Sequence, residues 1–301
     1  MRITGCMTAL ATPFGTNGEL DLNAWRTLLD RQLDGGIEAF IVAGSTGEAA
    51  SLFDQEFDAI LRLAVERIAG RVPVVAGTGM SNTQKTIEMT RRARALGADA
   101  ALVVTPPYVR PTTEGLIAHY EVIAADNSLP IIMYNVPGRT GVDMDIAVVE
   151  AMYKNPNIIG IKEARSDAAR MTALLKYKTP DFAVLSGDDA TACRAMLAGA
   201  DGLISVGSNV APATFRVLCD QARAEHAAEA RSIDQAMSPL YDFLSIEPNP
   251  IPVKALLGLQ GVGYGVRLPL QPLKQQYASE LRAMADLVGE LESTSLKALA
   301  A

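Results

Sequence analysis

The amino-acid sequence predicts an α/β fold, namely a closed (β/α)8 barrel followed by a small C-terminal α-helical domain. Eight apolar segments of strand length recur along the 301 residues. Amphipathic helical segments lie between them, at a spacing of roughly 20 to 35 residues that is typical of a TIM barrel. The alternative is an open doubly wound sheet, but the chain has neither a GxGxxG fingerprint nor a GxxxxGK[ST] phosphate loop.

The predicted strands are apolar and rich in β-branched residues. In chain order they cover residues 6–12, 38–44, 72–77, 99–105, 129–135, 157–164, 182–187 and 201–208. The helical segments after the first three strands have apolar residues at helical spacing and end at Gly36, Gly70 and Gly97, as glycine-capped helices do. The last barrel helix is expected from about Pro212 into Ala224.

The prediction divides the chain into two domains. Residues 1–224 would form the barrel that carries the active site, and residues 225–301 would form the helical domain. A proline-rich break at residues 247–254 interrupts the helical pattern of the second part.

Charge and composition exclude several functional classes. The 27 basic and 34 acidic residues give a net charge of −7 without any basic run, so nucleic acid and anionic membrane are poor partners. No apolar run has the length of a membrane span, and the N-terminus does not resemble a signal peptide, so we expect a cytoplasmic protein. Cys6, Cys193 and Cys219 are far apart and form no CxxC pair, which argues against a disulfide framework.

Few residues are available for metal or histidine chemistry. The chain has no set of His, Asp and Glu at metal-ligand spacing, so we expect no metal. Its two histidines, His119 and His226, lie in helical patterns and are interpreted as structural. Asp188 and Asp189 stand where a strand loop meets a helix, and there we expect helix N-capping rather than metal binding.

Two polar residues end successive apolar strands, Tyr134 and Lys162. Their separation of 28 residues is that of one strand-helix-strand unit, so both should face the same mouth of the barrel. A lysine amine that loses hydration there can attack a carbonyl and form a Schiff base with a keto acid. The alternative is a lysine paired with Glu163 or with another acid at the strand end, beside a tyrosine that only packs.

Other candidates lie in loops at the same end of the predicted barrel. Arg139 could bind a carboxylate or could be an ordinary surface arginine. In the turn GSTGE at residues 44–48, Ser45 and Thr46 offer hydroxyl and N–H groups to an anion or a proton relay, although a plain tight turn is also possible. Tyr108 could be a rim residue, a contact to a partner chain or a catalytic phenol.

Seven motifs together resemble one family. They are GSTGE, TPPYVRP, YNVPGRTG, GIKEA, SGDD, NPIPVKALL and RLPL. In this order, over nearly the whole chain, they are similar to the dihydrodipicolinate synthase (4-hydroxy-tetrahydrodipicolinate synthase) family of pyruvate-dependent aldolases. The resemblance implies a TIM barrel with a C-terminal helical domain, usually a homotetramer built as a dimer of dimers.

The resemblance also implies catalytic roles. Lys162 matches the Schiff-base lysine, and Tyr134 matches the phenol that moves protons to and from the pyruvate adduct. Ser45 stands where the family usually has the threonine of a hydroxyl relay, so the hydroxyl is kept and the methyl group is lost. Tyr108 matches the third relay member, which reaches the active site of a neighbouring subunit.

Substrate-binding roles follow in the same way. Thr46, in the turn that begins at Gly44, matches a residue that holds the pyruvate carboxylate. Arg139 matches the arginine that recognises the carboxylate of the aldehyde, and Ile204 fits a position whose backbone contacts the adduct. The implied reaction condenses pyruvate with (S)-aspartate 4-semialdehyde in lysine and diaminopimelate biosynthesis, through a covalent Schiff base and without a cofactor.

One departure from the family bears on regulation. In lysine-inhibited members, an effector pocket at the tight dimer interface is implied at positions that here hold Ala49, Asp54, Phe57, Ser81, Lys85 and Pro107. The Lys85 ammonium would repel the effector's ammonium, so we expect weak or absent inhibition by lysine.

Two other functions stay open at this point. One is a sister aldolase or dehydratase that uses the same lysine and tyrosine on a sugar-derived keto acid, such as a sialic acid or a deoxy-keto sugar acid. Arg139 favours the semialdehyde, because sugar-acid members commonly lack it. The other is a noncatalytic barrel, which the intact set of candidate catalytic residues disfavours.

Overall fold

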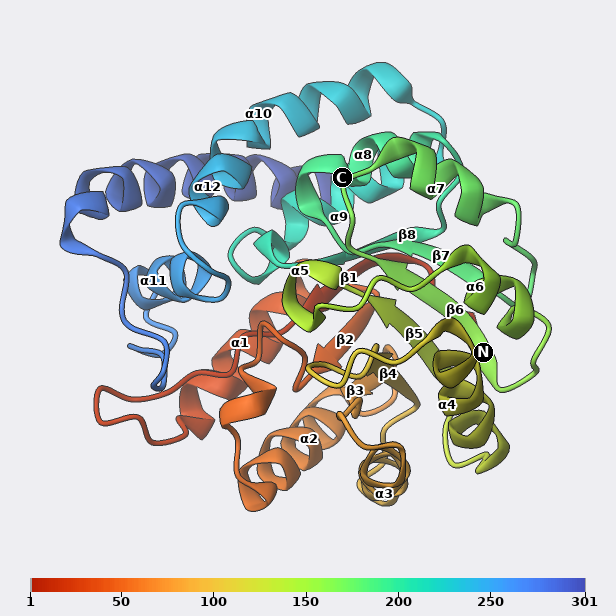
Figure 1. The fold of residues 1–301 in the computed structure, drawn as a ribbon. Helices are drawn as coiled ribbons and strands as arrows, with labels where there is room; N and C mark the ends of the chain where they lie inside the picture. Colours follow the sequence, from red (N-terminus) through yellow and green to blue (C-terminus); the bar gives the residue numbers. More distant parts are fainter. Residues whose placement is uncertain (1, 301) are drawn as a thin grey trace.

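The computed structural model describes residues 2–300. Within this range, eight parallel strands form a closed barrel in the order β1 to β8, and β8 pairs back onto β1 (Figure 1). The strands are β1 (Gly5–Ala9), β2 (Ala39–Val42), β3 (Val74–Gly77), β4 (Ala100–Val104), β5 (Ile131–Asn135), β6 (Ile158–Glu163), β7 (Ala183–Ser186) and β8 (Gly202–Ser205). The predicted barrel is confirmed, and each predicted strand segment overlaps one of these strands.

Helices surround the barrel and follow its strands (Figure 1). They are α1 (Leu22–Asp34), α2 (Asp54–Ile68), α3 (Thr83–Ala95), α4 (Thr113–Ala125), α5 (Pro137–Thr140), α6 (Ile146–Met152), α7 (Ala168–Leu175), α8 (Asp189–Leu197) and α9 (Pro212–Arg223). Short 3-10 turns are η1 (Ala49–Ser51), η2 (Gly207–Asn209) and η3 (Gln275–Tyr277). The predicted glycines Gly36, Gly70 and Gly97 follow α1, α2 and α3 with positive φ, the conformation in which glycine ends a helix at low cost.

Three further helices follow the barrel (Figure 1). They are α10 (Ala227–Ser245), α11 (Ile251–Leu259) and α12 (Ala278–Leu299). Helix α10 packs on α8 and α9, α12 packs on α9, and α11 packs on α10 and α12. Helix α12 holds the start of α9, because Glu292 accepts hydrogen bonds from the backbone N–H groups of Ala213 (2.8 Å) and Thr214 (3.0 Å). A carboxylate at a helix N-terminus is favourable, since it satisfies free N–H groups there. A domain boundary at residue 224 stays a prediction.

Two apolar layers hold the barrel together, because successive side chains of a strand point to opposite faces. The inner layer fills the barrel with residues such as Met7, Ile132 and Ile204. The outer layer lies between strands and helices and contains Trp25, whose indole N–H donates to the carbonyl of Ile60 at 3.0 Å. Polar residues at the carboxyl ends of the strands lie above the inner layer, where a pocket can form.

The structure also bears on the predictions about membrane helices, cysteines and histidines. No helix among residues 2–300 is long and apolar enough to cross a membrane. The thiols of Cys6, Cys193 and Cys219 are buried and free. His119 is buried and His226 is exposed, each within or beside a helix as predicted.

Candidate active site

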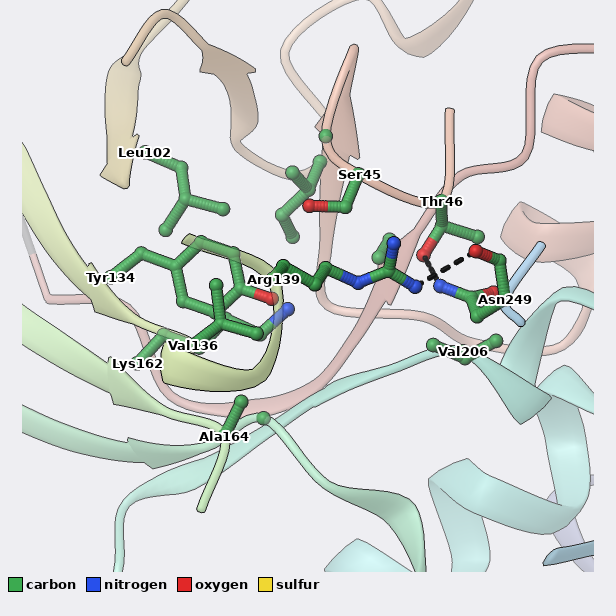
Figure 2. Close-up of a pocket in the computed structure, with 14 residues that line it drawn as sticks. Ser45, Thr46, Leu102, Tyr134, Val136, Arg139, Lys162, Ala164, Val206 and Asn249 are labelled. Carbon is green, nitrogen blue, oxygen red and sulfur yellow. Dashed lines mark hydrogen bonds between the residues drawn. The ribbon is translucent and has the colours of Figure 1, made fainter. Parts of the chain in front are cut away.

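A pocket with a volume of about 200 Å³ lies at the carboxyl ends of the strands (Figure 2). Six of the residues predicted for the site line it, and they are Gly44, Ser45, Thr46, Tyr134, Arg139 and Lys162. The remaining lining residues are Ala9, Ile41, Leu102, Val136, Ala164, Gly187, Val206 and Asn249. Residues from seven of the eight strands or the loops that follow them, all but β3, therefore converge with one residue of the C-terminal segment.

Lys162 and Tyr134 lie next to each other in this pocket. They are directly paired in the register of β5 and β6, and Lys162 Nζ lies 4.4 Å from the centre of the Tyr134 ring. Both residues are largely buried. Glu163 points to the opposite face and pairs with Arg170, so the alternative of a Lys162–Glu163 ion pair is wrong.

Gly187, which sequence reasoning missed, gives the Lys162 side chain its space. A Cβ atom at Gly187 would come within 2.7 Å of Lys162 Cε and 2.9 Å of Lys162 Cγ. Only glycine leaves room for the lysine stem in this position. Gly187 belongs to the SGDD motif, in which sequence reasoning considered only the two aspartates. The residue of this motif that lies against the Lys162 side chain is the glycine.

The turn at residues 44–48 forms one wall of the pocket. Ala43, the residue before the turn, has a φ of 56°, and Glu48, its last residue, has a φ of 52°; Thr46 is buried. The left-handed conformation is uncommon for residues other than glycine, so at Ala43 and Glu48 it requires support from the surrounding structure. The support comes from Glu48, whose buried carboxylate pairs with Lys254 of α11.

Asn249, which sequence reasoning also missed, connects two predicted substrate-binding residues. Its side-chain amide N–H donates to Thr46 Oγ1 at 3.0 Å, and its backbone carbonyl oxygen accepts from Arg139 Nη2 at 2.8 Å (Figure 2). Asn249 Oδ1 is buried and has no hydrogen-bond partner among residues 2–300. The only available signal was the proline-rich break at residues 247–254, which gave no reason to choose this asparagine.

Two predicted residues lie outside the pocket of the single chain. Tyr108 is 93 % exposed on the loop after β4 and has a φ of 74°. It therefore does not meet Tyr134 or Ser45 within one chain, and its role in a relay stays a prediction. Ile204 is buried in the inner layer of the barrel, and Val206, two residues further on, lines the pocket.

The expectation of N-capping for Asp188 and Asp189 is wrong in detail. Asp188 stands at the N-cap of α8, but its carboxylate accepts from the Thr191 hydroxyl and makes no capping bond to the backbone. Asp189 Oδ2 accepts from the N–H groups of Val206 (3.1 Å) and Gly207 (2.7 Å), because the loop after β8 folds over it. Burial raises the pKa of Asp189 to about 6. Among residues 2–300, no group of three His, Cys, Asp or Glu could hold a metal ion.

The closed barrel, with a lysine amine and a tyrosine phenol in the pocket at its carboxyl end, defines a TIM-barrel enzyme. A family model described as the Dihydrodipicolinate synthetase family matches residues 2–287. The chain belongs to this family, and it is an enzyme of the lyase class. The recognition made from the motifs is confirmed.

Two bacterial proteins are similar to the chain over nearly its whole length. A 4-hydroxy-tetrahydrodipicolinate synthase of Stenotrophomonas maltophilia is 55 % identical over 295 residues, which cover 98 % of this chain and 99 % of the relative. A protein of the same name from Xanthomonas campestris pv. campestris is 54 % identical over 301 residues, which cover 99 % of this chain and 100 % of the relative.

Solved structures show the same fold. The chloride-inhibited dihydrodipicolinate synthase of Acinetobacter baumannii, complexed with pyruvate, aligns with a TM-score of 0.93 at 41 % identity and covers 95 % of this chain and 99 % of that one. A monomeric dihydrodipicolinate synthase variant aligns with a TM-score of 0.93 at 38 % identity, covering 95 % and 97 %. One similar structure is therefore a monomeric variant, and the expected tetramer of this chain stays a prediction.

Proposed function

We propose that the chain catalyses the 4-hydroxy-tetrahydrodipicolinate synthase reaction, the condensation of pyruvate with (S)-aspartate 4-semialdehyde toward diaminopimelate and lysine. The names of relatives at 54 and 55 % identity support this reaction. The observation that carries the proposal is the contact between Lys162 and Tyr134 inside the pocket, 4.4 Å from amine to ring centre.

Lys162 supplies the covalent step. Its neutral amine adds to the keto carbon of pyruvate, and loss of one water gives an imine. Loss of a methyl proton converts the imine into an enamine, whose carbon attacks the aldehyde carbon while the aldehyde oxygen gains a proton. The amino group that came with the semialdehyde then attacks the imine carbon of the same adduct, which closes the ring and releases the Lys162 amine by transimination. The imine itself withdraws electrons, so the reaction needs no separate cofactor.

Tyr134 is proposed to move protons near that carbon. Its ring contacts Lys162, so its hydroxyl reaches an adduct built on the same amine. Ser45 lines the same pocket and offers a hydroxyl as the next relay member. Tyr108 would complete the relay from a neighbouring subunit, since it is exposed here. We accordingly propose a homo-oligomer, a tetramer built as a dimer of dimers, in the cytoplasm.

The carboxylates of both substrates would be held at the other wall. Thr46 and the turn beginning at Gly44 are proposed to bind the pyruvate carboxylate through hydroxyl and N–H groups. Arg139 has a planar fork of donors, which suits the carboxylate of the aldehyde. The backbone at Ile204 is proposed to contact the adduct from β8.

The test is pyruvate consumption by the purified protein with aspartate semialdehyde, beside a panel of sugar aldehydes. Lys162→Ala is the blank. Fast turnover with the semialdehyde alone, lost in the variant, supports the proposal. Turnover only with a sugar aldehyde would replace the proposed substrate and keep the Schiff-base chemistry.

A further inference from the structure

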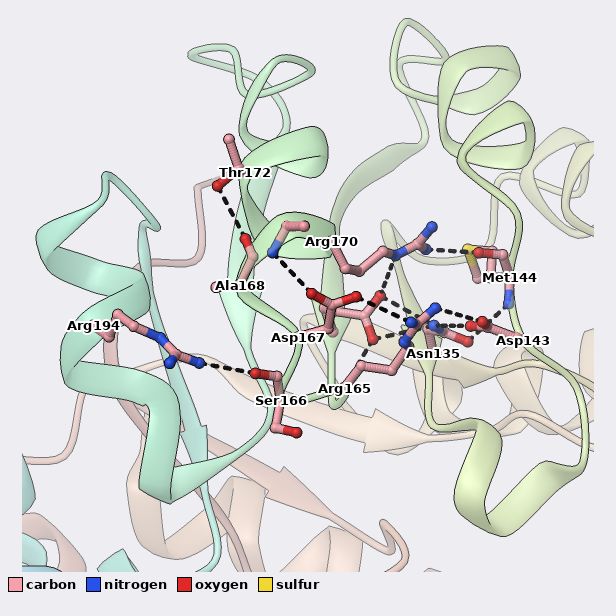
Figure 3. A network of polar contacts seen from close by, with 12 residues as sticks. Asn135, Asp143, Met144, Arg165, Ser166, Asp167, Ala168, Arg170, Thr172 and Arg194 are labelled. Carbon is pink, nitrogen blue, oxygen red and sulfur yellow. Dashed lines mark hydrogen bonds and ion pairs between the residues drawn. The ribbon is translucent and has the colours of Figure 1, made fainter.

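A polar network joins the end of β5 to α7 and to the segment after α5 (Figure 3). Asn135 follows Tyr134 at the end of β5, and Glu163 follows Lys162 at the end of β6. Because successive strand residues face opposite sides, Asn135 and Glu163 point away from the pocket, into the layer between strands and helices. Both side chains are fully buried.

Asn135 and Glu163 form hydrogen bonds across the two strands. Asn135 Nδ2 donates to Glu163 Oε1 at 3.1 Å and Oε2 at 3.0 Å, and also to Asp143 Oδ1 at 2.9 Å. Asn135 Oδ1 accepts from the backbone N–H of Met144 at 2.9 Å. The amide therefore ties β5, β6 and the segment after α5 together (Figure 3).

Arg170 of α7 neutralises the buried carboxylate. Its Nε donates to Glu163 Oε2 at 2.9 Å, and its Nη2 donates to the carbonyl of Met144 at 2.6 Å. The N–H of Arg165 donates to Glu163 Oε1 at 2.9 Å. A buried charge is tolerated only when it is paired and hydrogen-bonded, and a network of this kind holds one geometry.

The pairing of β5 with β6 is irregular at one point before the reactive residues. Ile131 pairs with Ile158, but the next residue, Ile132, pairs with Gly160, so the register shifts by one residue inside the strand pair. A shift of one residue turns a side chain to the other face of a sheet. The Asn135–Glu163 bonds lie beyond that irregularity, one residue after the Tyr134–Lys162 pair, and they add a side-chain link between the two strands beside the reactive residues.

We propose that Asn135, Glu163 and Arg170 are positioning residues that hold the Lys162 amine against the Tyr134 ring. The proposal deepens the proposed function and rests on it. The three residues do not touch the pocket, so they act through the strand ends. Their loss would slow formation of the pyruvate imine, because small displacements of reacting groups are costly, while pyruvate binding through the opposite wall would persist.

The test measures the rate at which borohydride traps pyruvate on Lys162, together with kcat and the KM for pyruvate, in Asn135→Leu, Arg170→Lys and Gln32→Leu. Asn135→Leu keeps the size of the side chain and removes its hydrogen bonds. Gln32→Leu is the control, because Gln32 is also fully buried and bonded to Thr8 and to the carbonyl of Ser208, in another part of the fold. All assays run at a temperature where circular dichroism shows each variant folded.

We expect trapping and kcat to fall about tenfold or more in Asn135→Leu, with a pyruvate KM within about threefold of the parent. Arg170→Lys keeps the charge and should lie between the parent and Asn135→Leu; if Asn135→Leu does not fold, Arg170→Lys decides alone. Gln32→Leu should lose stability and keep the trapping rate. Equal trapping rates in the parent and the folded network variants, or an equal fall in Gln32→Leu, would overturn the positioning role. Absence of trapping in the parent would instead contradict the proposed function.

Discussion

The Nζ atom of Lys162 lies 4.4 Å from the centre of the Tyr134 ring, and the two residues are direct neighbours across β5 and β6. This contact joins the amine and the phenol that the proposed reaction needs. The contact is made by the tyrosine ring, so the role of the ring and the role of the hydroxyl can be tested separately.

Replacing Tyr134 by Phe keeps the ring and removes the hydroxyl. We expect kcat to fall by about 10²- to 10⁴-fold, the usual contribution of a positioned proton donor or acceptor. Mass spectrometry after borohydride treatment should still detect pyruvate on the variant, formed slowly, and none on Lys162→Ala. A Tyr134→Phe protein with the parent's kcat would remove the phenol from the mechanism.

Ser45 is a second hydroxyl in the pocket. Ser45→Thr adds the methyl group that restricts the rotamer, so turnover should rise or stay the same. Ser45→Ala removes the hydroxyl and should lower turnover. Steady-state rates of both variants at saturating substrates check this, and a large fall in Ser45→Thr contradicts the relay role.

Asn249 orients Thr46 through a hydrogen bond of 3.0 Å. Asn249→Ala should raise the KM for pyruvate about two- to tenfold, since a net hydrogen bond contributes about 0.5–1.5 kcal/mol. The carbonyl that accepts from Arg139 belongs to the backbone and is kept, so the KM for the aldehyde should change less. Initial rates with each substrate varied in turn separate the two effects, and a rise confined to the aldehyde KM would show that Thr46 is not the residue affected.

Lys254 and Glu48 form an ion pair that is almost completely buried, between α11 and the turn at residues 44–48. Burial lowers the pKa of Lys254 to about 8, against the opposing effect of Glu48. Lys254→Met leaves the Glu48 carboxylate buried without its partner, so the free energy of unfolding should fall by about 3–5 kcal/mol. Urea unfolding measures the loss.

The matched control for this pair is the double variant Glu48→Gln with Lys254→Met. It removes both charges and should recover much of the lost stability, because no unpaired charge remains in the interior. A double variant as unstable as Lys254→Met alone would show that packing, rather than charge, is lost.

His119 should make stability depend on pH. Its Nδ1 lies 2.9 Å from the Thr83 hydroxyl, and burial lowers its pKa to about 4, compared with about 6.5 in an unfolded chain. Between these values the unfolded state binds more protons, so the free energy of unfolding should fall by about 3 kcal/mol as pH drops from 6.5 to 4. Below pH 4 the full cost is present, and above pH 6.5 it is absent.

His119→Gln should remove this part of the pH dependence, while His226→Gln should keep it because His226 is exposed. Unfolding midpoints in urea at a series of pH values check the difference. Identical slopes in His119→Gln and the parent would contradict the buried neutral histidine.

Much of the fold could be predicted from the sequence because the signals are local. Apolar runs and glycines after helices depend on neighbouring residues, and they located all eight strands among residues 2–300. The pairing of Tyr134 with Lys162 was also within reach, since one strand-helix-strand unit separates them. The family motifs then pointed to six residues that line the pocket.

Contacts between distant parts of the chain could not be predicted in this way. Asn249 and Thr46 are 203 residues apart, and Lys254 and Glu48 are 206 apart. Nothing in either segment alone indicates the other, because such pairs depend on where the C-terminal helices pack. The same holds for Gly187, whose role appears only when the Lys162 side chain lies against it.

The sequence by itself determined the barrel, the order of its elements and the residue types at its carboxyl end, because periodicity and turn chemistry act over a few residues. The tertiary structure alone decided which groups from distant segments meet. It turned Glu163 away from Lys162 and toward Arg170, placed Asn249 between two pocket residues, and left Tyr108 exposed. These outcomes depend on packing, in which each buried polar group must find a partner from whichever segment lies beside it.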